Sequence, residues 1–296
     1  MKPLTEQSNP RTEDIDRRST SEILALINDE DRIVAEAVSL VLDQIAEAVD
    51  LIVSRLDDGG RLIYIGAGTS GRLGVLDASE CPPTFGVPAT LVQGVIAGGY
   101  DALHSAVEGA EDDFNQGPRD LDSFGVSSHD AVVGISASGN TPYTLGALEH
   151  AKRIGAATIS VTCNPSSKMA GAADVSISPV VGPEVIAGSS RLKAGTAQKM
   201  VLNMLSTATM IRRGLVYGNM MSNLKATNQK LRGRACAILA EETELSSEEA
   251  ARLFESADGD LRLALLMARS PLSVEEAREL LRENGGSVRR ALDKVG

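Results

Sequence analysis

A glycine-rich loop that carries two hydroxyl side chains is the first feature of this sequence that could do chemistry. Residues 66–71 are Gly-Ala-Gly-Thr-Ser-Gly, and they join an apolar run that predicts a strand to a stretch that predicts a helix. Glycines let the backbone approach an anion closely, and a helix N-terminus presents free N–H donors and a partial positive charge. The loop therefore predicts an anion site, with Thr69 and Ser70 as candidate ligand contacts.

The same six residues also fit the glycine fingerprint of dinucleotide-binding folds. In those folds an acidic residue at the end of the second strand holds the ribose. Here the run that predicts the second strand, residues 90–97, is followed by two glycines. Hydroxyls in the loop also suit a sugar or a monophosphate, so we predict a sugar phosphate rather than a dinucleotide.

A second loop of similar character supports this interpretation. Residues 136–141 are Ser-Ala-Ser-Gly-Asn-Thr and again join a predicted strand to a predicted helix. Loops at the carboxyl ends of parallel strands converge on one crevice. We therefore expect Ser136, Ser138, Gly139 and Thr141 to surround a phosphate with hydroxyl and backbone N–H groups. Two ordinary capped turns remain the structural alternative.

Two carboxylates follow these loops closely enough to take part in proton transfer. Glu80 lies near the end of the helix predicted after the first loop, just before Pro82 and Pro83, which we expect to end that helix. A carboxylate at that end faces the negative pole of the helix dipole, which suits a general acid. Glu111 lies in the acidic cluster 108–113, after the second predicted strand. For both, a solvated surface acid is the alternative.

The elements that must position these residues predict an α/β fold. Short apolar runs alternate with helical stretches, which is typical of a three-layer arrangement with a mostly parallel sheet flanked by helices. The predicted strands are residues 61–66, 90–97, 131–136, 157–162 and 175–181, and the helices between them are 70–77, 102–113, 141–155 and 196–214.

We expect three segments along the chain. Residues 1–30 predict a polar N-terminal arm with a short helix at 21–28, and residues 31–234 predict the catalytic domain, which opens with a helical stretch. Residues 235–296 carry charged helices and two capping boxes, at 246–249 and 273–276. They predict a small, UBA-like helical subdomain.

Composition excludes several classes of partner. The net charge of −11 over 296 residues disfavours nucleic acid and anionic membranes, so a phosphate must be held by local donors. Three widely spaced cysteines, Cys81, Cys163 and Cys236, fit neither a disulfide framework nor a zinc site. No apolar run is long enough to span a bilayer. We expect a cytoplasmic protein without metal or cofactor.

At this point the sequence resembles a known family. Residues 4–9, 27–31, 66–72, 76–86, 106–112, 133–142 and, at greatest length, 188–203 match strings of the sugar isomerase (SIS) fold. More narrowly, the chain is similar to the N-acetylmuramic acid 6-phosphate etherases, relatives of the glucokinase regulatory protein. The resemblance covers nearly the whole chain.

The resemblance implies cleavage of the lactyl ether of N-acetylmuramic acid 6-phosphate to N-acetylglucosamine 6-phosphate and D-lactate, in recycling of cell-wall sugars. Glu80 matches the family's proton donor and Glu111 its second catalytic acid. A base removes the C2 proton, the C3–O bond breaks, and water adds across the double bond. Carboxylates suffice for these transfers, so the resemblance implies no metal or redox cofactor.

The matching segment at 188–203 adds Ser189, Ser190 and Lys193 as candidate ligand contacts. Lys193 is either a cation for the phosphate or a structural residue of the following helix. Related single domains form two-fold dimers with sites near the interface, so a homodimer is expected. A sugar-phosphate-sensing regulator and an aldose–ketose isomerase remain alternative functions.

Overall fold

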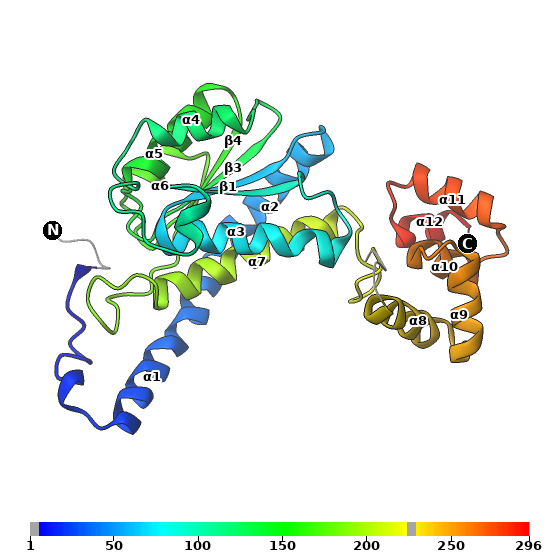
Figure 1. Cartoon of the computed structure of the whole chain (residues 1–296), viewed down its shortest axis with the longest axis horizontal. Coiled ribbons are helices and arrows are strands. Elements are labelled where there is room, and N and C mark those ends of the chain that lie inside the picture. Colours follow the sequence, from blue (N-terminus) through cyan, green and yellow to red (C-terminus); the bar gives the residue numbers. More distant parts are fainter. Residues whose placement is uncertain (1–5, 224–228, 296) are drawn as a thin grey trace. The chain divides into compact units, whose positions relative to one another are not determined.

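The computed structural model describes residues 6–223 and 229–295 of the chain (Figure 1). Residues 4 and 5 of the motif at 4–9 lie outside the described residues. The chain divides into two compact units: Met1–Ser79 with Ala89–Ser206, and Glu80–Pro88 with Thr207–Gly296. The limits expected for the arm, the catalytic domain and the C-terminal subdomain stay a prediction.

A five-stranded, wholly parallel sheet forms the centre of the first unit. Its order is β2-β1-β3-β4-β5, with the strands β1 Leu62–Gly66, β2 Val92–Ile96, β3 Ala131–Ile135, β4 Ala157–Val161 and β5 Val175–Ile177. All five predicted strands are confirmed, with shorter ends. Every residue of β1, β3 and β4 is buried, because helices cover both faces of a parallel sheet.

The two faces of the sheet bind different helices. The helices that lie wholly in this unit are α1 Thr20–Ser39, α2 Leu42–Asp57, α4 Gln116–Ser123, α5 Pro142–Arg153 and α6 Lys168–Ala172. Helices α3 Gly68–Phe85 and α7 Lys193–Arg212 begin in it, and their last residues belong to the second unit. Ile63 and Ile65 of β1 pack with residues of α4, α5 and α6, whereas Tyr64 donates from its hydroxyl to Asp77 of α3. Figure 1 shows these layers.

The strand order creates a crevice between β1 and β3. Strand β1 pairs with β2 on one side and with β3 on the other, so the connections after β1 and β3 diverge from neighbouring strand ends. Ligands bind at such reversal points in open α/β sheets. Both predicted phosphate loops start at this place.

Two helices expected from the sequence have different limits in the structure. The helix predicted at 102–113 is wrong: a short 3-10 helix, η3 Tyr100–Leu103, is followed by turns, and a helix begins only at Gln116. Gly109 has φ +74°, which interrupts any helix there. The short helix predicted at 21–28 is part of the longer α1.

Helix α3 does not end at the proline pair. Pro82 and Pro83 lie inside it, and it continues to Phe85, where Gly86 at φ +65° ends it. Each proline removes one backbone hydrogen-bond donor. The side chains of Cys81 and Phe85 in this last turn are buried, and their packing stabilises the helical turn without those donors. Glu80 therefore lies before the last turn of α3, and the expected position at the helix terminus was wrong.

The second unit contains the C-terminal helical bundle predicted from the sequence. Its helices are α8 Gln229–Thr243, α9 Ser247–Ser256, α10 Leu261–Ala268, α11 Val274–Glu283 and α12 Val288–Val295. Ser246 with Glu249 and Ser273 with Glu276 form the two predicted capping boxes. Phe254 and the leucines of α10 are buried in its core.

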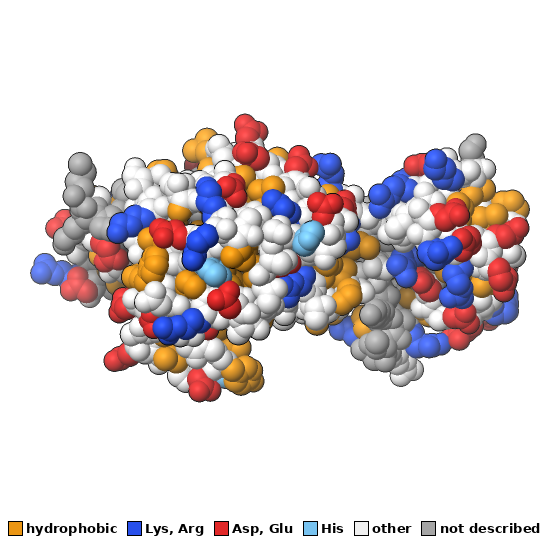
Figure 2. Space-filling model, turned by 90° about the horizontal axis from the view of Figure 1, so that it is seen from above, with side chains coloured by type: hydrophobic (Ala, Val, Ile, Leu, Met, Phe, Trp, Pro, Cys, Tyr) orange, Lys and Arg blue, Asp and Glu red, His pale blue; other side chains and the backbone are white. Residues whose placement is uncertain are grey.

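Charged side chains of both signs lie on the face shown in Figure 2. The acidic and basic side chains are interspersed there. Within residues 6–223 and 229–295, no helix combines the length and apolar character needed to cross a bilayer.

Candidate functional site

A polar cavity of about 450 Å³ lies at the carboxyl ends of β1 and β3. Its wall includes residues 67–70 of the first loop and Ser136, Ser138 and Thr141 of the second. Glu111 and Asp112 join them from the segment before α4, together with Glu6, Gly188 and Ser190. The two loops expected to converge are therefore brought together.

The second loop is organised around the hydroxyl of Ser136. Ser136 Oγ lies 2.8 Å from Thr141 Oγ1 and 3.4 Å from Ser138 Oγ, and it accepts from the Gly139 N–H over 3.1 Å. Gly139 is not among the described residues that line the cavity, but its φ of +66° forms the turn, and a Cβ there would lie 2.3 Å from Ser167 Oγ. Only glycine fits this position.

The first loop places Thr69 and Ser70 in the first turn of α3, where backbone N–H groups have no helical partner. Gly71 allows close packing, since a Cβ there would lie 2.6 Å from the Gly66 carbonyl oxygen and from the Ile96 side chain. The glycines thus draw the start of α3 onto the ends of β1 and β2. With α5 beginning at Pro142, two helix N-termini face the loop region and favour an anion.

Gln198 of α7 controls the orientation of Ser70. Ser70 Oγ donates to Gln198 Oε1 over 2.9 Å, and Gln198 is 1% exposed. Its Nε2 is buried and has no hydrogen-bond partner among the described residues, which is costly. Rotating the amide by 180° makes Nε2 the donor to Ser70, so that the Ser70 hydroxyl can donate to a ligand in the cavity.

Sequence reasoning did not identify Gln198 as a site residue. It lies in the string 188–203, in which the sequence indicated only Ser189, Ser190 and Lys193 as candidate ligand contacts. Its distance of 128 positions from Ser70 in the chain leaves no local pattern to detect. The residues around it, which include Thr196, Lys199 and Asn203, do not mark it out either.

Glu111 reaches the cavity on a segment that α5 holds in place. Its carbonyl oxygen accepts from the backbone N–H of Tyr143 over 3.0 Å. The Tyr143 hydroxyl donates to Asp120 Oδ2 over 2.6 Å. Burial, followed by this hydrogen bond and the charge of Asp120, raises the pKa of Tyr143, so the phenol remains a donor at neutral pH.

The N-terminal arm contributes Glu6, which sequence reasoning also missed as a site residue. Asn9 Nδ2 donates to the Pro183 carbonyl over 3.3 Å, and Thr12 Oγ1 donates to the Val185 carbonyl over 2.8 Å. These contacts bind the arm along the segment before α7, and a Cβ on Gly188 would lie 3.2 Å from Glu6 Oε2. The motif at 4–9 thus includes a residue, Glu6, that lines the cavity.

The side chain of Lys193 makes an ion pair and is not among the described residues that line the cavity. Its side chain is fully buried and its Nζ lies 2.6 Å from Glu30 Oε2, while Arg11 pairs with the same carboxylate at 2.7 Å. None of the described residues that line the cavity is a lysine, an arginine or a histidine. A phosphate there must therefore be held by hydroxyl and N–H donors.

Glu184 anchors the matching segment 188–203 at the start of α7. Its carboxylate accepts from the backbone N–H groups of Lys193 and Ala194 at 2.9 and 3.0 Å. Burial raises the pKa of Glu184, and these N–H groups oppose that shift. Ser190 lines the cavity, whereas Ser189 is not among the described lining residues.

Glu80 belongs to the second compact unit, whereas the residues of the cavity belong to the first. It is exposed and is twelve residues beyond Gly68 on α3, a separation of about 18 Å along a helix axis. It is not among the described residues that line the cavity. Of the two predicted catalytic carboxylates, Glu111 lines this cavity and Glu80 does not.

The part of α3 before Glu80 is fixed by a buried carboxyl group. Asp77 accepts from the Tyr64 hydroxyl at 2.9 Å, from Asn203 Nδ2 at 2.6 Å and from Ser206 Oγ at 3.2 Å. Burial raises the pKa of Asp77 against these donors. The group ties α3 to β1 and α7 one turn before Glu80.

Comparison with known proteins places the site in a family. The model of the SIS domain matches residues 104–208, and that of the glucokinase regulatory protein N-terminal SIS domain matches 44–152. An N-acetylmuramic acid 6-phosphate etherase of Clostridium botulinum is 54% identical over 294 residues, covering 99% of this chain and 97% of the relative. The chain belongs to the N-acetylmuramic acid 6-phosphate etherase family. The resemblance predicted from the sequence is thereby confirmed.

A second etherase of this family, from Brucella anthropi, is 54% identical over 290 residues and covers 98% of this chain and 94% of its own length. Among solved structures, a phosphoheptose isomerase of Neisseria gonorrhoeae matches 64% of this chain and 97% of its own. Its TM-score is 0.48 and its identity 18%. The etherases match along almost their whole length, including both hydroxyl-rich loops and the C-terminal helices.

Proposed function

We propose that this chain is a carbon–oxygen lyase that cleaves the lactyl ether of N-acetylmuramic acid 6-phosphate, yielding N-acetylglucosamine 6-phosphate and D-lactate. Its place is the recycling of cell-wall amino sugars in the cytoplasm. The observation that carries the proposal is the cavity in which two hydroxyl-rich loops meet Glu111 at the reversal point of the sheet. The full-length identity to relatives named etherases supports it.

The phosphate binds at the second loop in this proposal. Ser136, Ser138 and Thr141 present hydroxyls to one cavity, and the N-terminus of α5 adds backbone N–H donors. The helix dipoles replace the missing basic side chains. Thr69, Ser70 and Ser190 then contact sugar hydroxyls, with Ser70 oriented by Gln198.

The reaction uses proton transfers that carboxylates can perform. In the open-chain sugar, the C1 aldehyde acidifies the C2 proton. Glu111 removes that proton, electrons form the C2–C3 double bond, and the C3–O bond breaks as an acid protonates the departing lactate oxygen. Water then adds across C2–C3, with hydroxide to C3 and a proton to C2, which restores the saturated sugar.

The acid that protonates lactate is Glu80 in this proposal, and a homodimer supplies it. Within one chain, Glu80 is not among the described residues at the cavity that contains Glu111. A two-fold dimer places the same surface of each copy against the other, so each cavity receives Glu80 from the second copy. The site is then complete only in the dimer.

Isotope labelling tests the proposed chemistry. Turnover of the phosphorylated muramic sugar in heavy-oxygen water should place the label at C3 of the sugar product and none in lactate. Label in lactate would mean direct displacement at the lactyl carbon and would contradict the elimination. A ketose product without lactate would support the isomerase alternative, and binding without any turnover would support the regulator, although the relatives' names favour neither.

A further inference from the structure

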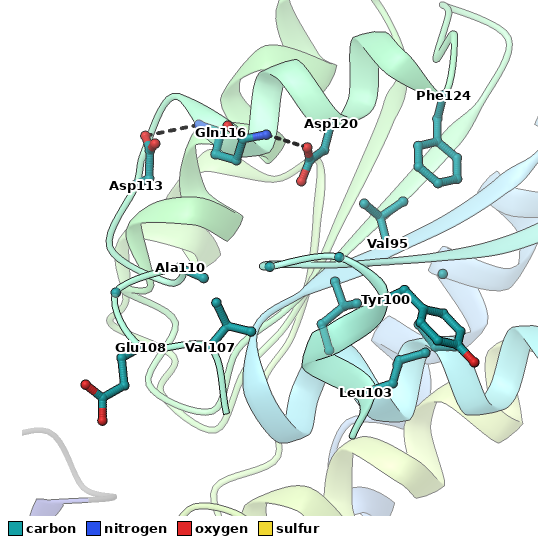
Figure 3. A pocket seen from close by; sticks show the side chains of 16 residues that line it. Val95, Tyr100, Leu103, Val107, Glu108, Ala110, Asp113, Gln116, Asp120 and Phe124 are labelled. Carbon is teal, nitrogen blue, oxygen red and sulfur yellow. Dashed lines mark hydrogen bonds between the residues drawn. The ribbon is translucent and has the colours of Figure 1, made fainter. Parts of the chain in front are cut away.

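A second, larger cavity of about 900 Å³ lies beside the edge strand β2 and also belongs to the first unit. It is formed by the end of β2, by η3 and by the segment that leads into α4 (Figure 3). Its volume is within the range of small-molecule sites. None of the residues of this cavity has been assigned a role in the proposed reaction.

The cavity has an apolar wall with carboxylates on one side. Val95, Leu103, Val107 and Phe124 supply apolar surface, while Asp113 and Asp120 line it as acids. Figure 3 shows Glu108, also an acid, pointing away from these side chains. None of the described lining residues is a lysine, an arginine or a histidine.

Asp120 is held by neutral donors alone. Its Oδ1 accepts from Gln116 Nε2 and its Oδ2 from the Tyr143 hydroxyl, each at 2.6 Å. It makes no ion pair with any lysine, arginine or histidine in residues 6–223 and 229–295. Each carboxylate oxygen can accept a second hydrogen bond, so Asp120 has capacity for a cationic donor from a ligand.

This cavity shares a wall with the polar cavity at the ends of β1 and β3, which is called the catalytic cavity below because the proposed reaction takes place there. Residues 108–110 and Asp113 line the larger cavity, and residues 111 and 112, between them, line the catalytic one. Tyr143 connects the two sides, because its backbone N–H donates to the Glu111 carbonyl and its hydroxyl donates to Asp120. A ligand bound to Asp120 thus contacts the acceptor of the Tyr143 hydroxyl, and the backbone N–H of Tyr143 in turn holds Glu111.

We propose that the larger cavity is a second ligand site, which takes a small molecule with an apolar body and a protonated amine, and that its occupancy alters ligand binding at Glu111. The apolar wall receives the body of the molecule, and Asp120 receives the amine. Coupling between the two sites rests on the proposed function of the catalytic cavity. Binding at the larger cavity does not depend on that proposed function.

Three probes of the same size test the binding. Calorimetry should show that 4-phenylbutylammonium binds the full chain at least about tenfold more tightly than 4-phenylbutanol or 4-phenylbutyrate, a difference of about 1.4 kcal/mol. Asp120→Asn should remove this preference, and Asp113→Asn should reduce it. Leu103→Trp should weaken all three probes by filling the cavity, whereas Leu40→Trp, at an exposed position outside it, should change nothing.

Equal binding of the ammonium and the carboxylate, or an unchanged preference in both aspartate variants, would overturn the site. So would tight binding that survives Leu103→Trp, because the probe would then lie elsewhere. If Asp120→Asn does not fold, the Asp113→Asn and Leu103→Trp results still decide the matter.

A second titration tests the coupling. Saturating 4-phenylbutylammonium should change the Kd of N-acetylglucosamine 6-phosphate by about fivefold or more, and the sugar phosphate should change the Kd of the ammonium by the same factor. An unchanged Kd would overturn the coupling. Failure of the sugar phosphate to bind at all would contradict the proposed function, while the probe preference would still establish the second site.

Discussion

Ser70 and Gln198 form a hydrogen bond of 2.9 Å between the first loop and α7, and both side chains are nearly inaccessible to solvent. This contact links the first loop to α7, the long helix that begins within the string 188–203. It also gives the buried side chain of Gln198 a hydrogen-bond partner. The effect of losing this hydrogen bond can be measured as a change in sugar-phosphate binding.

Gln198→Met should weaken sugar-phosphate binding about tenfold, or about 1.4 kcal/mol, because Ser70 loses the amide that, once rotated by 180°, donates to its hydroxyl. The volume of the side chain is nearly kept, so folding should change little. Calorimetric titration with N-acetylglucosamine 6-phosphate checks this.

Gln198→Glu serves as the matched variant, since an ionised carboxylate accepts but cannot donate to Ser70. It should bind sugar phosphate no better than Gln198→Met. Binding at the wild-type level in Gln198→Glu would show that Ser70 does not need to donate to the ligand.

Gly139→Ala should destabilise the fold and disrupt the phosphate loop. A residue with a side chain at φ +66° costs about 1–2 kcal/mol, and the contact of 2.3 Å with Ser167 Oγ adds about 1–3 kcal/mol. Urea denaturation measures the loss. Sugar-phosphate affinity should fall as well, because the Gly139 N–H orients Ser136.

Gly125→Ala is the control for this substitution. Its φ is +60°, but no atom lies within 4 Å of the added Cβ, so it should show the backbone cost alone and keep full affinity. Equal losses of stability in the two variants would contradict the steric account of the loop.

Lys193→Met should destabilise the chain by about 3 kcal/mol, because Glu30 is left buried with a weaker set of partners. The double variant Glu30→Gln, Lys193→Met should recover much of this stability. Denaturant melts of both variants test the difference.

Sugar-phosphate binding in that double variant separates the two roles that the sequence allowed for Lys193. A structural role predicts an affinity close to that of the wild type. A loss of binding of tenfold or more in a stably folded double variant would assign the ammonium to the phosphate after all.

The sequence predicted the parts of this site that depend on local patterns. The five strands were located because each is a short apolar run between glycines and polar residues, and both hydroxyl-rich loops follow from strand ends. The helix predicted at 102–113 was wrong because apolar spacing outweighed Gly109, whose positive φ ends helical structure there.

Contacts between distant positions could not be predicted in the same way. Glu6, Gln198 and the pair of Glu30 with Lys193 acquire their roles from partners far away in the chain. The position of Glu80 depended on where α3 ends, and two prolines in sequence suggested an earlier end than packing allows. The catalytic roles of Glu80 and Glu111 stay predictions.

Mixing two inactive variants tests whether the site is shared between two chains. Glu80→Gln and Glu111→Gln should each lose turnover, and refolding them together at equal concentration should restore about a quarter of wild-type activity. Half of the dimers are then mixed, and each mixed dimer has one intact cavity. No recovery, with dimers confirmed by light scattering, would place both carboxylates in one chain's site.

The most direct measurement is the release of D-lactate from N-acetylmuramic acid 6-phosphate by the wild-type chain and by Glu111→Gln, with calorimetric binding of the product sugar phosphate to both. The proposed function predicts lactate release by the wild type, at least about a thousandfold less by the variant, and binding of the product by both proteins. Lactate release by Glu111→Gln at the wild-type rate, or none by a wild type that binds the sugar phosphate, would contradict it.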